Sequence, residues 1–119
     1  MRKKTIAIDF DGTIVECKYP DIGELRKDAK EIINKLYDDG YIIIINSCRS
    51  AMYEAGIYKT LKENDIDYDY INCNHPSSIE AFGMDCRKIS ADIYIDDKNL
   101  GGIPDWKTIY EIIKKQLND

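Results

Sequence analysis

Two carboxylates stand two residues apart at the point where an apolar run ends. They are Asp9 and Asp11, in the stretch Ile6-Ala7-Ile8-Asp9-Phe10-Asp11-Gly12-Thr13. Side chains at positions i and i+2 of an extended chain point the same way, so both carboxylates can share one small volume. Close carboxylates repel each other unless a cation or a shared proton joins them. Oxygen ligands of this kind suit Mg²⁺, which takes one or two carboxylates together with waters and a substrate phosphate.

The same stretch also fits a strand that enters an ordinary Asp-Gly turn, because both residues are common in turns. An EF-hand does not fit, since Gly12 comes too early and no Glu closes a twelve-residue loop. Other polar side chains help to decide whether this stretch is part of a functional site or an ordinary Asp-Gly turn. Ser47 and Arg49 follow a second apolar run, and the pair Asp96-Asp97 follows another. Polar clusters at the ends of three separate apolar runs favour a functional site.

The apolar runs that precede these clusters have the composition of buried strands. Four consecutive isoleucines fill 42–45, which is typical of a strand buried on both faces in a parallel sheet. Between the runs, apolar residues recur at helical spacing. We expect strands at 5–8, 41–45, 68–73 and 93–95, and helices at 24–39, 51–63 and 106–117. We also expect core contacts from Met52, Ala55 and Leu61, a small flap over 14–23, and mostly loop with one helical turn over 74–88.

This alternation of strands and helices predicts an α/β fold, an open parallel sheet with right-handed crossovers. In such sheets, ligands bind outside the carboxyl ends of the strands. All three polar clusters follow a predicted strand directly, so we expect them at the same edge of the sheet. Lys88 lies just before the last predicted strand.

Length and composition narrow the class of protein. The chain has 119 residues, which allows one domain over 1–119, and it is 44% hydrophobic and 33% charged, as in ordinary globular proteins. We find no apolar run long enough for a membrane span and no secretory signal. Four cysteines without a C-x-x-C pair then favour reduced thiols and a cytoplasmic location. The net charge of −5 disfavours nucleic acid as a partner, because such binding needs a basic face.

With these residues in hand, the chain resembles the haloacid dehalogenase-like (HAD) hydrolases, a superfamily mostly of phosphatases. Asp9-Phe10-Asp11-Gly12-Thr13 matches the first family motif, D-x-D-G-T. Ser47 matches the second motif, a Ser or Thr after an apolar strand, and Lys88 matches the third, a Lys or Arg. Asp96-Asp97 matches the fourth, an acidic pair after an apolar strand. The resemblance covers nearly the whole chain and implies a Rossmann-like three-layer sandwich with a mainly parallel sheet of strand order 3-2-1-4.

The resemblance implies phosphomonoester hydrolysis through an aspartyl phosphate. Asp9 would attack the phosphorus, and Asp11 would protonate the leaving oxygen and then take a proton from the attacking water. Mg²⁺ would be held by the Asp9 carboxylate, the Asp11 backbone carbonyl and either Asp96 or Asp97. An acid two residues after the nucleophile is needed by a phosphatase and not by a dehalogenase.

The resemblance assigns the phosphate oxygens to Ser47, as a hydrogen-bond donor, and to Lys88, as a point charge. Arg49 either binds the substrate or pairs on the surface, and the role of His75 stays open. A second reading belongs to another class: a non-catalytic metal- or phosphate-binding module of the same fold that acts through a protein partner. The set of matching residues favours the enzyme, since loss of any one of them would cripple the chemistry.

Access to the site follows from the lengths of the connections. Many relatives carry a cap domain, inserted either after the first motif or before the lysine motif. Here 13–24 has room only for a flap, and 74–87 is too short for a folded unit of about 50 residues. We therefore expect a capless, open site, with the lid supplied by the flap, by a large substrate or by another subunit of a homo-oligomer. The acidic balance favours a small phosphorylated metabolite as substrate.

Overall fold

A four-stranded sheet forms the centre of the protein. The structure is a computed structural model and describes residues 3–117. The sheet contains β1 (Thr5–Asp9), β4 (Ile42–Asn46), β5 (Tyr70–Ile71) and β6 (Ile93–Ile95), in the order β5-β4-β1-β6. All neighbouring pairs are parallel, so the predicted α/β class and strand order are confirmed. β1 is paired on both sides, and its two faces are buried in different clusters, Ile6 and Ile8 in one and Ala7 in the other, which explains the continuous apolar run.

The predicted flap is a separate antiparallel hairpin of β2 (Val15–Lys18) and β3 (Asp21–Leu25). Its second strand occupies residues that we expected to begin the first helix, so the predicted start at Glu24 was wrong. α1 (Ala29–Asp38) begins after Asp28, which takes a left-handed conformation with φ of 65°. The helical spacing of Leu25 misled the prediction, because Leu25 packs against the same core from a strand.

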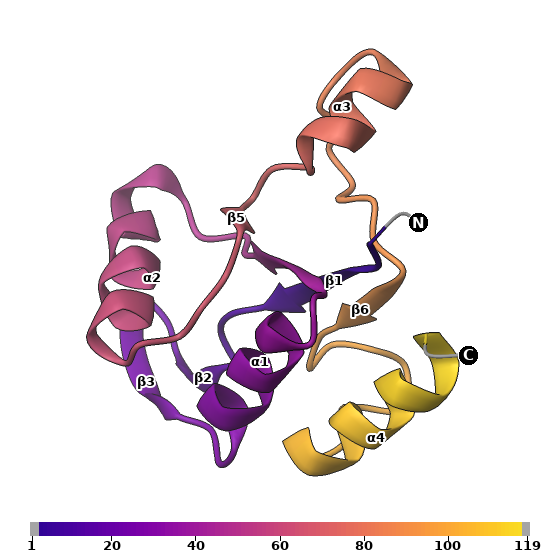
Figure 1. The fold of residues 1–119 in the computed structure, drawn as a ribbon. Coiled ribbons are helices and arrows are strands. Elements are labelled where there is room, and N and C mark those ends of the chain that lie inside the picture. The colour runs from indigo at the N-terminus through magenta and orange to yellow at the C-terminus, as the bar shows by residue number, and fades with distance from the viewer. Residues whose placement is uncertain (1–2, 118–119) are drawn as a thin grey trace.

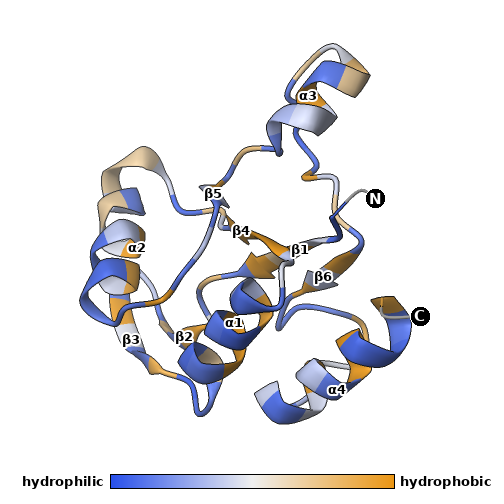
Figure 2. Ribbon diagram, viewed as in Figure 1, coloured by the Kyte–Doolittle hydropathy of each residue, from blue (hydrophilic) through white to orange (hydrophobic). Residues whose placement is uncertain are grey.

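Three helices cover one face of the sheet, as Figure 1 shows for α1, α2 (Ala51–Glu63) and α4 (Trp106–Leu117). Side chains alternate between the two faces of each strand, and Ile6, Ile8, Ile43 and Ile45 share one cluster with the buried residues of these helices. Figure 2 shows the central strands as hydrophobic and the outer surfaces of the helices as hydrophilic. The core therefore lies between the sheet and this helical layer.

The contacts of α2 were only partly predicted. Leu61 is buried as expected, but Met52 and Ala55 are exposed, and Ile57 and Thr60 are the other buried residues of the helix. α2 also lies beside the flap, since a Cβ on Gly56 would be 3.0 Å from the Ile22 side chain. The buried residues of α2 all lie from Ile57 onward, so this part of the helix reaches the core.

The opposite face of the sheet is covered by an extended segment rather than by a packed helix. Ala7, Ile42 and Ile44 form a second cluster with Ile89, which lies in the connection between β5 and β6. In the same connection α3 (Pro76–Phe82) extends away from the sheet (Figure 1). The sequence predicted mostly loop with one helical turn here. The helix is longer than one turn, and the His75 ring accepts a hydrogen bond from the Ser77 amide at its start.

β5 is shorter than the predicted strand over 68–73. The Asp69 carboxylate accepts a hydrogen bond from the Ile43 amide before the strand begins, and Asn72 turns the chain afterwards with φ of 53°. Within residues 3–117 there is no separate cap domain, as predicted. In the same range no helix has the length and apolar character of a membrane span.

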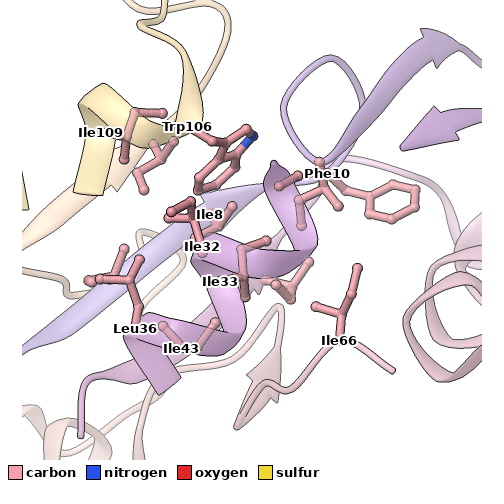
Figure 3. Packing of buried hydrophobic residues seen from close by; sticks show 14 of the residues in the cluster. Ile8, Phe10, Ile32, Ile33, Leu36, Ile43, Ile66, Trp106 and Ile109 are labelled. Atoms are coloured by element: carbon pink, nitrogen blue, oxygen red, sulfur yellow. The ribbon is translucent and has the colours of Figure 1, made fainter. Parts of the chain in front are cut away.

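The core also fixes the loop that follows β1. Figure 3 shows Trp106 and Ile109 packed beside Ile8 and Ile32. The Trp106 indole Nε1 donates a buried hydrogen bond of 3.0 Å to the backbone carbonyl of Thr13. A residue of the last helix thus anchors the first motif from within the core.

Candidate active site

Three carboxylates meet at the carboxyl end of the sheet. Asp9 ends β1, and Asp96 and Asp97 follow β6, which pairs with β1 through Ile8 and Ile95. Each of the three acids offers an oxygen within 4.8 Å of the others, and all three side chains are half-buried. The parallel register therefore brings together the acids of two motifs that stand far apart in the sequence.

The charge of Asp9 is poorly compensated at this position. Burial, a hydrogen bond with Asp97 and the charge of Asp96 raise the pKa of Asp9 from 3.8 to about 7. The Thr13 hydroxyl donates to Asp9 Oδ2 at 3.0 Å and opposes this rise. The same hydroxyl oxygen accepts from the Asp97 amide at 3.1 Å. Thr13 thus ties the loop after β1 to the loop after β6.

Gly12 allows the two loops to approach. Its φ is 86°, a left-handed conformation, and a Cβ placed there would clash with Asp97 Oδ2. Any larger residue would push Asp97 away from Asp9. The cluster that results has the donor set of a hard divalent cation: carboxylate oxygens, partly shielded from water and repelling one another. These residues fit Mg²⁺.

Asp11 does not join this cluster through its side chain, because it pairs with Arg49. Arg49 Nε donates to Asp11 Oδ2 at 2.7 Å, and Nη2 donates to Oδ1 at 2.7 Å. This two-pronged pair raises the pKa of Arg49 above its ordinary value. A metal contact through the Asp11 backbone carbonyl stays a prediction.

Arg49 also binds the flap. Nη1 donates to the Pro20 carbonyl and Nη2 to the Asp21 carbonyl, both at 2.8 Å. The residue is 6% exposed, although the sequence placed it at the tip of a strand and left a surface pairing open. All four hydrogen bonds of the guanidinium go to Asp11 or to flap carbonyls, so in the structure Arg49 joins Asp11 to the flap.

Ser47 lies beside the acids, directly after β4. Its backbone amide donates to Asn72 Oδ1 at 2.7 Å, and its hydroxyl accepts from the Arg49 amide at 3.1 Å. The hydroxyl proton is therefore free to point at a ligand. Asn72 is a positioning residue that sequence reasoning did not select, because the predicted strand over 68–73 enclosed it, whereas β5 ends at Ile71.

The structure distinguishes Lys88, which the third motif selected, from Lys98, for which we predicted no role. Lys88 is exposed, and its ammonium lies 5.2 Å from the centre of the Tyr94 ring. It does not line the cleft over the acids. Lys98 does, with its ammonium 3.9 Å from Asp97 Oδ2 and its amide donating to Asp96 Oδ1 at 2.8 Å. Its position directly after the acidic pair was a usable signal.

The acids form the floor of a cleft with a volume of 410 Å³, which is in the size range of small-molecule sites. Three of its rim residues, Cys17, Tyr19 and Cys48, were not selected from the sequence, and His75 is not among its lining residues. The cleft is lined by Asp9, Asp11, Cys17, Tyr19, Ser47, Cys48, Arg49, Asp96, Asp97 and Lys98. All predicted site residues except Lys88 therefore meet there. The arrangement places carboxylates, a hydroxyl and an ammonium around one volume.

Comparison with known proteins agrees with this geometry. The chain matches the family of haloacid dehalogenase-like hydrolases over residues 6–115. It is also similar to a solved structure from Bacteroides thetaiotaomicron, described as a conserved protein, with 36% sequence identity, a TM-score of 0.85 and 99% of each chain covered. No curated protein matches the chain. Since the family match spans nearly the whole chain, the protein belongs to the haloacid dehalogenase-like hydrolases.

Proposed function

We propose that this hydrolase is a Mg²⁺-dependent phosphatase that cleaves phosphomonoesters through an aspartyl phosphate on Asp9. The observation that carries the proposal is the cluster of Asp9, Asp96 and Asp97, with oxygens within 4.8 Å, on the floor of a cleft that also holds Asp11 and Ser47. The raised pKa of Asp9 supports it, because a divalent cation bound there would relieve the repulsion and keep Asp9 ionised as a nucleophile.

In the first step, a carboxylate oxygen of Asp9 attacks phosphorus, and the bond from phosphorus to the leaving oxygen breaks. Asp11 supplies the proton that the leaving oxygen needs. In the second step, Asp11 takes a proton from water as the water attacks phosphorus and releases Asp9. In the structure the Asp11 side chain accepts two hydrogen bonds from Arg49. For the first step the pair must loosen so that Asp11 can carry a proton.

Other residues hold the phosphate during these steps. The Ser47 hydroxyl donates to one phosphate oxygen, and its backbone is fixed for this by Asn72. Lys98 supplies a positive charge at the same edge, a role that the family motif assigned to Lys88. Asp9, Asp96 or Asp97, and the Asp11 carbonyl would hold the metal. When bound, Mg²⁺ would neutralise charge on the phosphate and shield it from the nucleophile.

The setting of the site supports a small phosphorylated metabolite as substrate. The cleft has the volume of a small-molecule site, and the acidic net charge disfavours nucleic acid. All four cysteines are unpaired, in keeping with a reducing, cytoplasmic location. The lid is the flap, or a second subunit in a homo-oligomer.

The proposal is tested by turnover of 4-nitrophenyl phosphate with Mg²⁺ and with EDTA, in the wild type and in Asp9→Asn. We expect release of phosphate that needs Mg²⁺ and is lost in the variant while the circular dichroism spectrum is unchanged. An absence of turnover with this substrate and with a panel of phosphorylated metabolites would favour the non-catalytic module instead. Full activity in EDTA would contradict the metal dependence.

A further inference from the structure

The geometry points to a subsite for the leaving group on the flap, with Tyr19 as its platform. This inference rests on the proposed phosphatase function and goes further by naming a substrate class. The site would take phosphomonoesters whose leaving group is planar and uncharged, as an aromatic ring is. The phosphate would lie over the acids on the floor, and the leaving group would lie against the rim.

Tyr19 occupies the right place for such contacts. It lies at the turn between β2 and β3 and lines the same cleft as Asp9 and Asp11. Half of the residue is exposed, at 50%. A large aromatic surface is thus open to solvent at the mouth of a catalytic cleft, where covering it by a ligand would be favourable.

The ring is held in position although it stands on a flap. The Arg49 guanidinium lies over it, 5.0 Å from the ring centre. Tyr53 of α2 meets it edge-on, with 5.4 Å between ring centres and 74° between planes. Arg49 is itself fixed by Asp11 and by the flap carbonyls. A ring fixed before binding loses little conformational freedom when a substrate stacks on it.

The neighbours of Tyr19 favour an uncharged group. The other rim residues, Cys17 and Cys48, are exposed cysteines and supply no cation. The Arg49 guanidinium is committed to four hydrogen bonds within the protein, so it is a weak partner for a second anion. Lys98 is the other cation that lines the cleft, and its ammonium lies 3.9 Å from Asp97 Oδ2. A second carboxylate or phosphate on the substrate would therefore compete with Asp97 and with the reacting phosphate for Lys98.

The test compares two substrates that differ in planarity. Benzyl phosphate and cyclohexylmethyl phosphate both release a primary alcohol of similar size and basicity. We expect the wild type, with Mg²⁺, to favour benzyl phosphate about tenfold in kcat/KM, the size of a favourable aromatic contact. Tyr19→Phe should keep the preference, and Tyr19→Leu should remove it. Because the readout is a ratio of two substrates, a general loss of activity in a variant cancels.

A matched control and a charged substrate complete the experiment. Tyr58 is another half-exposed tyrosine, on α2, and it does not line the cleft. Tyr58→Leu should leave the ratio unchanged. Addition of a carboxylate to the ring, in 4-carboxybenzyl phosphate, should lower kcat/KM. Equal rates for both neutral substrates in the wild type, or a preference that survives Tyr19→Leu, would overturn the subsite. If neither substrate is hydrolysed in a Mg²⁺-dependent way, the proposed function itself fails.

Discussion

Removal of one charge from the acid cluster should stabilise the metal-free protein and abolish turnover. In the folded chain, burial and the neighbouring acids Asp97 and Asp96 raise the pKa of Asp9 from 3.8 to about 7. Because the folded pKa lies above the unfolded value, the folded state binds the proton more tightly. The free energy of unfolding therefore falls as the pH rises between these two values and stays low above them. Asp9→Asn removes this penalty.

The size of the effect follows from the shift. One pKa unit corresponds to about 1.4 kcal/mol, so the full shift would amount to about 4 kcal/mol. Asp9 is only half-buried, and screening by solvent reduces this to about 2 kcal/mol. For a chain of this size that is about 8 °C in Tm. An asparagine amide keeps the shape and can still accept from Thr13 and donate to Asp97, so packing should not change.

Asp11→Asn is the matched control with the opposite sign. It changes the same chemical group two residues away, but it leaves the buried guanidinium of Arg49 without its anion. Loss of one partner from such a pair costs about 3 kcal/mol. Both variants should lose activity, yet the Tm of Asp9→Asn should lie above that of the wild type and the Tm of Asp11→Asn below it.

The assay is thermal or urea unfolding in EDTA at about pH 5 and about pH 8. Asp9→Asn should exceed the wild type at the higher pH and lose most of its advantage at the lower one. At the lower pH, Asp9 in the folded wild type already carries a proton. The reasoning is refuted if the variant is no more stable than the wild type at the higher pH, or if its advantage is the same at both.

Three further predictions concern the metal, the flap and the two lysines. Mg²⁺ should raise the Tm of the wild type by a few degrees and that of Asp97→Asn by less, because a ligand of the native state stabilises by mass action; equal shifts by calorimetry would argue against a shared site. Arg49→Lys should lower kcat about 100-fold and speed amide hydrogen exchange in the flap residues 15–25, since one ammonium cannot replace the four hydrogen bonds of the guanidinium. Unchanged exchange would contradict the proposed contact of Arg49 with the flap. Lys98→Met should raise KM more than Lys88→Met does, because only Lys98 lines the cleft; the reverse order in steady-state kinetics would restore the family assignment.

The sheet could be predicted because its strands carry their signal locally. Four isoleucines in succession and the run before Asp9 have no arrangement open to them except burial on both faces. The start of α1 could not be read in the same way. Leu25 stands at a helical spacing from Ala29, but it is the last residue of β3 in the flap. Asp28, in a left-handed conformation, separates this strand from α1. Spacing alone does not distinguish a helix from a strand that packs against the same core.

The acid cluster was also predictable, since parallel strands bring their carboxyl ends together whatever lies between them. Arg49 was harder, because its partners Pro20 and Asp21 belong to a hairpin whose path depends on tertiary packing. Lys88 was selected by its match to a family motif, whereas the path of the chain after β6 brings Lys98 to the cleft. A sequence pattern does not predict the role of a residue when that role depends on the path of a loop.

The central claim is that Asp9 carries the phosphoryl group during turnover. The most direct measurement is acid quench of the Asp11→Asn variant during reaction with 4-nitrophenyl phosphate and Mg²⁺, followed by peptide mass spectrometry. A good leaving group needs little help from an acid, whereas release of the intermediate needs the base, so the intermediate should accumulate. The account predicts one phosphoryl group on the peptide that contains Asp9, located at Asp9 by fragmentation. Turnover with a phosphoryl group on another residue, or with Asp9 unmodified at every quench time, would contradict it.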